Sequence, residues 1–142
     1  MKFTCTALCV VVAVFLLAPA ASAADLVVTV TDIRNGQGNI RFALYDKADE
    51  FPRGERFRGT DVAARQGSVQ VEFKDLPSGT YALAIHHDEN DDKEMNTYFM
   101  VVPREGYGFA NDARVIFGPP SFEAASFPVK GDRTEITLRA RY

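Results

Sequence analysis

Five oxygen-bearing residues occupy alternate positions in one acidic segment of the chain: Asp88, Asn90, Asp92, Glu94 and Asn96. Calcium binds about six to eight oxygen ligands, and an Asp-x-Asn-x-Asp spacing lets one tight loop present several of them to a single ion. Four of these residues would contribute a side chain, and Glu94 would contribute its backbone carbonyl. The spacing therefore predicts a calcium site.

The same segment departs from a calcium-binding loop at two positions. The sixth position of such a loop requires glycine for a sharp turn, and Lys93 stands there. The twelfth position requires a bidentate glutamate, and Phe99 stands there, so the missing acid would have to come from Glu105 or Asp112. The alternative is a solvated acidic turn whose Asp and Asn side chains bond their own backbone.

Two histidines, His86 and His87, precede the acidic segment. Neighbouring residues of a strand point to opposite faces, so these two rings cannot bind one metal together. His87 has the same parity as Leu83 and Ile85, so we expect it at the rim of the core with one ring nitrogen bonded to a loop carbonyl or carboxylate, and we expect His86 at the surface. His87 is the one candidate for a catalytic residue, although a general base also needs a nucleophile or water site.

Apolar and polar residues alternate along the elements that must position these groups. This period of two predicts strands in five segments, 26–31, 40–44, 69–73, 81–85 and 136–140. Shorter strands are expected at 98–102 and 114–117, and a brief helix is possible within 46–65. The Gly-containing turns at 35–38 and 76–79 suit antiparallel hairpins. The sequence therefore predicts an all-β fold, a single antiparallel two-sheet sandwich of about seven strands, immunoglobulin-like or prealbumin-like.

The amino terminus has the pattern of a signal peptide. Lys2 precedes an apolar run at 7–20, and Ala21-Ser22-Ala23 fits a signal peptidase site. We expect a signal peptide at 1–23 and a β-sandwich domain at 24–142. The domain would be periplasmic or secreted, with no membrane anchor after cleavage.

Composition narrows the possible partners and chemistry. Both cysteines, Cys5 and Cys9, lie in the expected leader, so the exported domain would have no thiol chemistry. The net charge of −3 argues against nucleic acid or an anionic membrane surface as the main partner. Neither a Gly-x-Ser-x-Gly nor a His-Glu-x-x-His motif is present.

An aromatic and Gly/Pro-rich stretch follows the acidic segment. The residues predicted to contact a ligand or partner are Tyr98, Glu105, Tyr107, Phe109 and Phe122. Aromatic side chains at a loop-built mouth can line a groove for a ligand. The alternative, which we favour for most of these rings, is that they fold the loop back as a small satellite core.

Several motifs resemble known families. The segment 76–81, Leu-Pro-Ser-Gly-Thr-Tyr, resembles a turn of transthyretin-like and carboxypeptidase-regulatory-like modules. More specific motifs resemble, in order and spacing, an exported bacterial family, domain-of-unknown-function family 2141: His-Asp-Glu-Asn at 87–90, Pro-Arg-Glu-Gly-Tyr-Gly-Phe at 103–109 and Gly-Pro-Pro-Ser-Phe at 118–122. The resemblance spans essentially all of 24–142 and implies the sandwich and export, but no reaction. Residues 91–96 depart from the family pattern, in which Gly and Asn positions precede Lys-Leu-Asp.

Three functional classes are compatible with these features. The favoured one is an exported non-catalytic module that binds a small ligand, a glycan or an envelope protein through the 87–127 end. A second is a metal-assisted hydrolase, with Asp88, Asp92 and Glu105 as ligands and His87 as proton carrier. A third is a structural accessory that adds a strand to a larger assembly. No cofactor other than calcium is expected.

Overall fold

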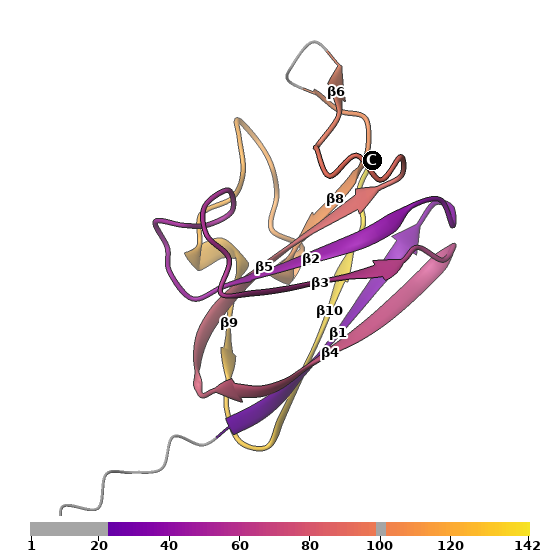
Figure 1. Ribbon diagram of the computed structural model, residues 1–142. Helices are drawn as coiled ribbons and strands as arrows, with labels where there is room; N and C mark the ends of the chain where they lie inside the picture. The colour runs from indigo at the N-terminus through magenta and orange to yellow at the C-terminus, as the bar shows by residue number, and fades with distance from the viewer. Residues whose placement is uncertain (1–22, 99–101) are drawn as a thin grey trace, which may run out of the picture.

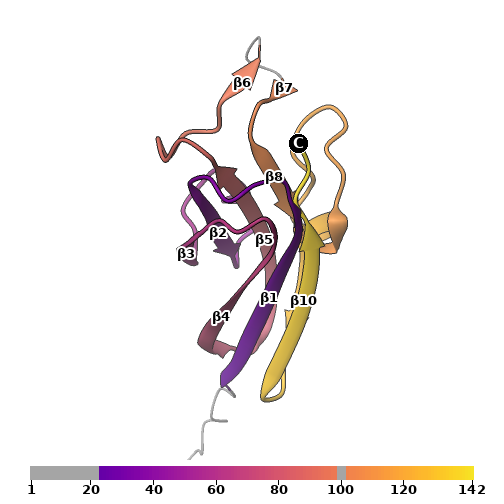
Figure 2. The ribbon, with the colours of Figure 1, turned by 90° about the vertical axis from the view of Figure 1, so that its right-hand side faces the viewer.

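Two β-sheets pack face to face in the computed structural model, which describes residues 23–98 and 102–142 (Figures 1 and 2). The predicted signal peptide, apart from Ala23, lies outside the described residues and stays a prediction. Among the described residues, no helix has the length and apolar character needed to cross a membrane.

The first sheet has three strands in the order β10-β1-β4. Its strands are β1 (Ala23–Ile33), β4 (Gly67–Pro77) and β10 (Arg133–Arg139). The second sheet has the order β3-β2-β5-β8, and β9 also pairs with β5. Its strands are β2 (Asn39–Tyr45), β3 (Arg58–Ala63), β5 (Gly79–Asp88), β8 (Gly106–Phe109) and β9 (Ser126–Val129). Two short strands, β6 (Thr97–Tyr98) and β7 (Val102–Pro103), form a separate hairpin, and two 3-10 turns are η1 (Ala110–Asp112) and η2 (Glu123–Ala125).

The core lies between the sheets and follows the predicted alternation. Buried apolar side chains alternate along five strands and face the same core: Leu26, Val28, Val30, Ile40, Phe42, Leu44, Val71, Phe73, Tyr81, Leu83, Ile85 and Leu138. Because alternate residues of a strand point to opposite faces, this pattern confirms the five strands predicted from periodicity and the all-β sandwich they form.

The structure differs from the sequence analysis in three details. First, β10 runs parallel to β1, although the other paired strands are antiparallel, because the chain reaches β10 from β9 in the opposite sheet and not through a hairpin. Second, residues 114–117 form an open loop and not a strand. Third, residues 46–57 form turns rather than a helix.

Three strands escaped the sequence analysis. β8 has the sequence Gly-Tyr-Gly-Phe, and glycine is depleted in strands. Close packing accounts for its glycines: a Cβ on Gly108 would lie 2.5 Å from the backbone oxygen of Arg139. The other two are β3, whose sequence shows no clear apolar alternation, and β9, whose alternation extends over only four residues. An isolated bridge between Tyr107 and Arg141 links the two sheets beside β8.

Candidate cation site and adjoining pocket

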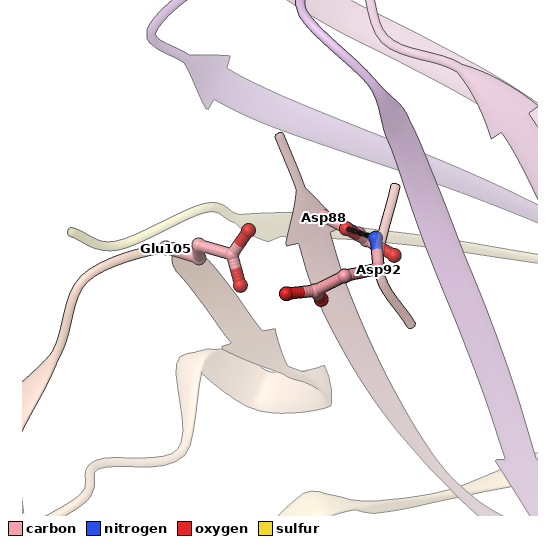
Figure 3. A group of neighbouring side chains, drawn as sticks. All are labelled: Asp88, Asp92 and Glu105. Atoms are coloured by element: carbon pink, nitrogen blue, oxygen red, sulfur yellow. Dashed lines mark hydrogen bonds between the residues drawn. The ribbon is translucent and has the colours of Figure 1, made fainter. Parts of the chain in front are cut away.

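Three carboxylates converge at the end of the sandwich where β5 stops and β8 starts. Asp88 ends β5, Asp92 lies in the following loop, and Glu105 precedes β8. Each offers one oxygen, and these oxygens all lie within 4.8 Å of one another. Figure 3 shows the Glu105 carboxylate pointing toward those of Asp88 and Asp92. This spacing matches oxygens that share one cation at Ca–O distances of about 2.3–2.6 Å.

Strand pairing brings the distant acid to the loop. β5 and β8 are antiparallel, and His87 pairs with Gly106. The next residues outward, Asp88 and Glu105, therefore face each other across the ladder. Both are buried, with exposed fractions of 0% for Asp88 and 4% for Glu105. Of the two acids that the sequence offered to complete the site, Glu105 is the one present; Asp112 instead accepts hydrogen bonds from Arg139.

The loop after β5 is held by its own short polar side chains. The Asp88 carboxylate accepts the backbone N–H groups of Asp92 at 3.2 Å and Lys93 at 2.9 Å. Asn90 Oδ1 accepts the N–H of Asp92 at 3.2 Å, and Asp92 Oδ1 accepts that of Glu94 at 2.8 Å. Lys93 has φ of 67°, the left-handed conformation for which calcium loops use glycine. The backbone thus makes the sharp turn despite the lysine.

Glu105 closes the loop from the other side. Its Oε1 accepts the backbone N–H of Glu89 at 3.0 Å, and its Oε2 accepts that of Asn96 at 3.1 Å. The His86 ring nitrogen Nε2 also lies 3.0 Å from Oε2. His86 was expected at the surface, but it is half-buried because the loop and Glu105 cover its ring. One buried carboxylate therefore fastens both ends of the acidic loop.

Amide groups surround the most exposed carboxylate of the three. The side-chain nitrogens of Asn90 and Asn96 lie 2.8 and 2.9 Å from Asp92 Oδ2. The Asn96 hydrogen bond, followed by those of the Glu94 N–H and Asn90, lowers the pKa of Asp92 below its ordinary value. A half-turn of either amide would place an oxygen where the nitrogen now lies, so both asparagines can act as cation ligands.

His87 is enclosed on every side. It is fully buried, its Nε2 lies 2.8 Å from the Gln37 carbonyl oxygen, and its Nδ1 lies 2.7 Å from the Tyr142 hydroxyl. A carbonyl only accepts, so Nε2 donates to Gln37, while Nδ1 is hydrogen-bonded to the Tyr142 hydroxyl. The predicted inward position and loop-carbonyl bond are confirmed. With both ring nitrogens engaged, His87 serves to hold β5 against the neighbouring turn and the carboxyl terminus.

The predicted aromatic contacts divide into two groups. Phe109 and Phe122 pack around Phe51, with ring centroids 5.8 and 6.1 Å from it, in a second apolar cluster that half-buried Tyr107 also joins. Phe51, in the turns after β2, was not among the residues predicted to contact a ligand or partner. Tyr98 is 53% exposed and contributes to a pocket instead. Phe109, Phe122 and Tyr107 therefore belong to a satellite core, as favoured from the sequence, whereas Tyr98 does not.

A polar pocket of about 450 Å³ adjoins the three carboxylates. Its walls are formed by Arg34, Glu89, Asn90, Asn96, Tyr98, Pro103, Arg104, Glu105 and Tyr142. The Arg34 guanidinium pairs with Glu89 and lies 4.3 Å from the Tyr142 ring centroid, and that of Arg104 lies 4.7 Å from the Tyr98 centroid. The hydrogen bond from Arg34 lowers the pKa of Glu89 and raises that of Arg34. Of the predicted ligand contacts, Tyr98 and Glu105 lie in this pocket.

Sequence reasoning missed Arg34, Arg104 and Tyr142. Arg34 lies next to the predicted turn at 35–38, and Tyr142 is the last residue, so neither belonged to a recognisable motif. Arg104 lay inside the family motif at 103–109, but it occupies the variable second position of that motif, so nothing marked it as a pocket residue. Only the tertiary arrangement assembles them.

The fold and the site together define the class of protein. It is an all-β sandwich module that has an acidic cluster and an adjoining pocket at the end where β5 and β8 meet. The chain belongs to the family described as "Uncharacterized protein conserved in bacteria (DUF2141)", whose model matches residues 28–137. No curated protein and no solved structure matches the chain at a significant level. The family match thus agrees with the motif resemblance and brings no known activity with it.

Proposed function

We propose that the protein is an exported, non-catalytic β-sandwich module that binds Ca²⁺ through Asp88, Asp92 and Glu105 and presents the adjoining pocket to a ligand or envelope partner. The observation that carries the proposal is the convergence of three carboxylate oxygens from two separate chain segments within 4.8 Å of one another. Asn90, Asn96 and the Glu94 carbonyl would complete the oxygen ligands.

The charge around the three acids favours a cation. Asp88 and Glu105 are buried, and burying carboxylates is costly unless positive charge or hydrogen bonds compensate. The nearest guanidinium, that of Arg41, lies 3.8 Å from Asp88 and is shared with Asp61. Backbone N–H groups also donate hydrogen bonds to both buried carboxylates. The three carboxylates still outnumber the one shared guanidinium, and a hard divalent ion would balance their charge with the oxygen chemistry it prefers.

The surroundings of His87 favour binding over catalysis. The hydrolase alternative needs this ring to carry protons to or from a substrate. The ring is fully buried, and both of its nitrogens are engaged by Gln37 and Tyr142. Support for a general base at this position is therefore lacking.

The pocket beside the acids suggests the chemistry of the ligand. It offers two guanidinium groups, two carboxylates, two side-chain amides and two tyrosine rings, and the guanidinium of Arg34 is already paired with Glu89. Guanidinium groups pair with carboxylates and phosphates, and aromatic rings and amides contact sugar rings and hydroxyls. A polar ligand such as a glycan, with any acidic group directed at Arg104, fits this combination.

Calorimetric titration of EDTA-treated protein with CaCl₂ tests the ion site. We expect one ion to bind, with a dissociation constant of about 0.1–1 mM, as in extracellular calcium modules. Binding to the native state alone would also raise the thermal midpoint with calcium concentration, adding about 2.7 kcal/mol at a hundredfold excess over the dissociation constant.

Two matched variants make the test specific. Glu105→Gln removes one of the three converging carboxylates and should abolish binding. Glu94→Gln removes an exposed carboxylate of the same loop but keeps its backbone carbonyl, so binding should persist. Absence of both a heat signal and a melting shift in the wild-type protein would refute the calcium proposal.

A further inference from the structure

The loop between η1 and η2 exposes three consecutive apolar side chains to solvent. Ile116 is 74% exposed and Phe117 is fully exposed, while Val115 beside them is also exposed. Large apolar side chains clustered in this way are uncommon on soluble domains and mark contact sites. The segment Gly118-Pro119-Pro120 follows directly, and its two fixed proline φ angles limit how far the loop can fold back. The loop therefore holds an apolar tip away from the sandwich.

A second apolar tip lies at the same end of the molecule. Tyr98 in β6 and Val102 in β7 are 53% and 56% exposed. Figures 1 and 2 agree that the β6–β7 hairpin and the loop after η1 both project from the end opposite the β9–β10 turn. Two separate, convex apolar tips are thus presented in the same general direction.

A guanidinium accompanies each tip. Arg114 directly precedes Val115 and lines a groove with Ile116 and Phe117, and Arg104 follows β7 closely. Within the described part of the chain, no carboxylate lies within salt-bridge distance of Arg114 or Arg104. Each tip thus carries one guanidinium that has no carboxylate partner among the described residues, although the carboxylates of the 88–96 loop lie at the same end and the chain as a whole is acidic.

We infer that this end of the sandwich docks on a lipid bilayer that carries anionic phospholipids. Ile116 and Phe117 would enter the acyl boundary, Tyr98 would lie at the headgroup level, and the two arginines would pair with lipid phosphates. Interfacial proteins combine apolar and aromatic side chains with flanking basic residues in this way. A fluid bilayer accommodates two separate convex tips, whereas a protein partner would need two matching pockets. The inference is independent of the proposed ion site, because neither tip contributes one of its ligands.

Co-sedimentation with lipid vesicles tests the inference. The probes are vesicles of equal parts phosphatidylglycerol and phosphatidylcholine, and vesicles of phosphatidylcholine alone, each measured in EDTA and in calcium. We expect the protein to bind the anionic vesicles more tightly in at least one of the two buffers. The acidic loop lies at the same end, so calcium is expected to strengthen this binding.

Variants identify the contacting residues. Phe117→Ser and Ile116→Ser should each weaken binding by about tenfold or more, since each removes a large apolar side chain from the bilayer. Arg114→Gln should weaken binding to anionic vesicles, whereas Lys130→Gln, which removes a charge at the β9–β10 turn, should not. Unchanged melting midpoints would show that the variants fold.

Three results would overturn the inference. They are absence of vesicle binding in both buffers, wild-type binding by Phe117→Ser, and self-association that depends on Phe117 without any vesicle binding. The last result would assign the tips to a second copy of the chain. If the protein bound no calcium, the inference would still be tested by vesicle binding in EDTA and by the effect of Phe117→Ser on that binding.

Discussion

The Tyr142 hydroxyl is hydrogen-bonded to Nδ1 of His87 over 2.7 Å and thereby ties Tyr142 to the end of β5. The same hydroxyl accepts the backbone N–H of Arg34 at 3.2 Å. Three segments far apart in the sequence therefore meet at one phenol, next to the residue that begins the acidic loop.

Replacing this phenol tests its contribution to stability. Tyr142→Phe keeps the ring but leaves the buried Nδ1 of His87 without its hydrogen-bond partner, and we expect a loss of about 1–3 kcal/mol in the free energy of unfolding. Urea denaturation measures this loss. Tyr98→Phe, which removes an exposed phenol at the same end, is the control and should change stability by less than about 0.5 kcal/mol. Equal effects of the two variants would show that the His87 contact is energetically neutral.

Gly38 sets the distance between the turn after β1 and the end of β5. Its φ is 62°, and a Cβ at this position would lie 1.9 Å from the backbone oxygen of Asp88. Gly38→Ala must therefore displace the strand that carries Asp88, and we expect a loss of more than about 2 kcal/mol in unfolding free energy.

Gly67 supplies the matched control for this substitution. It also has a positive φ, of 94°, but nothing lies within 4 Å of its ideal Cβ. Gly67→Ala should therefore cost only the conformational strain, about 1–2 kcal/mol. Thermal or urea unfolding of both variants decides the matter, and a Gly38→Ala protein no less stable than Gly67→Ala would contradict the close contact.

Acid should weaken the ion pair between Arg34 and Glu89. The hydrogen bond from Arg34 is the main cause that lowers the pKa of Glu89 below its ordinary value of 4.5. A carboxyl with a lowered pKa stabilises the native state fully above that ordinary value, and the stabilisation disappears as the pH falls through the lower native pKa. The difference in unfolding free energy between the wild type and Glu89→Gln should therefore be constant near neutral pH and shrink below about pH 4.5.

The size of this difference is modest because Arg34 is partly exposed to solvent. We expect at most about 1 kcal/mol at neutral pH, as for other partly exposed pairs. Glu94→Gln is the control, since the Glu94 carboxylate pairs with no cation among the described residues. Urea unfolding across the acid range measures both variants, and a Glu89→Gln difference that grew on acidification would have the wrong sign.

Local sequence patterns predicted the strands in which apolar residues recur at every second position. Leu26, Val28 and Val30 alternate with Val27, Thr29 and Thr31, and a strand with one wholly apolar face needs little more than that period to be recognised. The acidic loop could also be predicted from local sequence, because the side chains of Asp88, Asn90 and Asp92 accept hydrogen bonds from backbone groups within five residues. Even the choice of Glu105 or Asp112 as a distant acid followed from ligand chemistry, although only the structure selected Glu105.

Long-range pairing was beyond the reach of those patterns. The parallel register of β1 with β10 joins Val28 to Ile136, and no local period encodes the direction in which a distant strand approaches. Residues 114–117 have the composition of a strand, but they pair with no other strand among the described residues and form an open loop.

The sequence by itself therefore determined that the chain forms a sandwich of alternating strands with one acidic loop, because these features depend on interactions between residues close in the chain. Only the tertiary structure decided that Glu105 completes the acidic cluster, that Tyr142 covers His87, and that Ile116 and Phe117 stay in solvent. Each of these outcomes depends on which strands pair and which loops find a surface to pack on, and that is settled by the free energy of the whole fold.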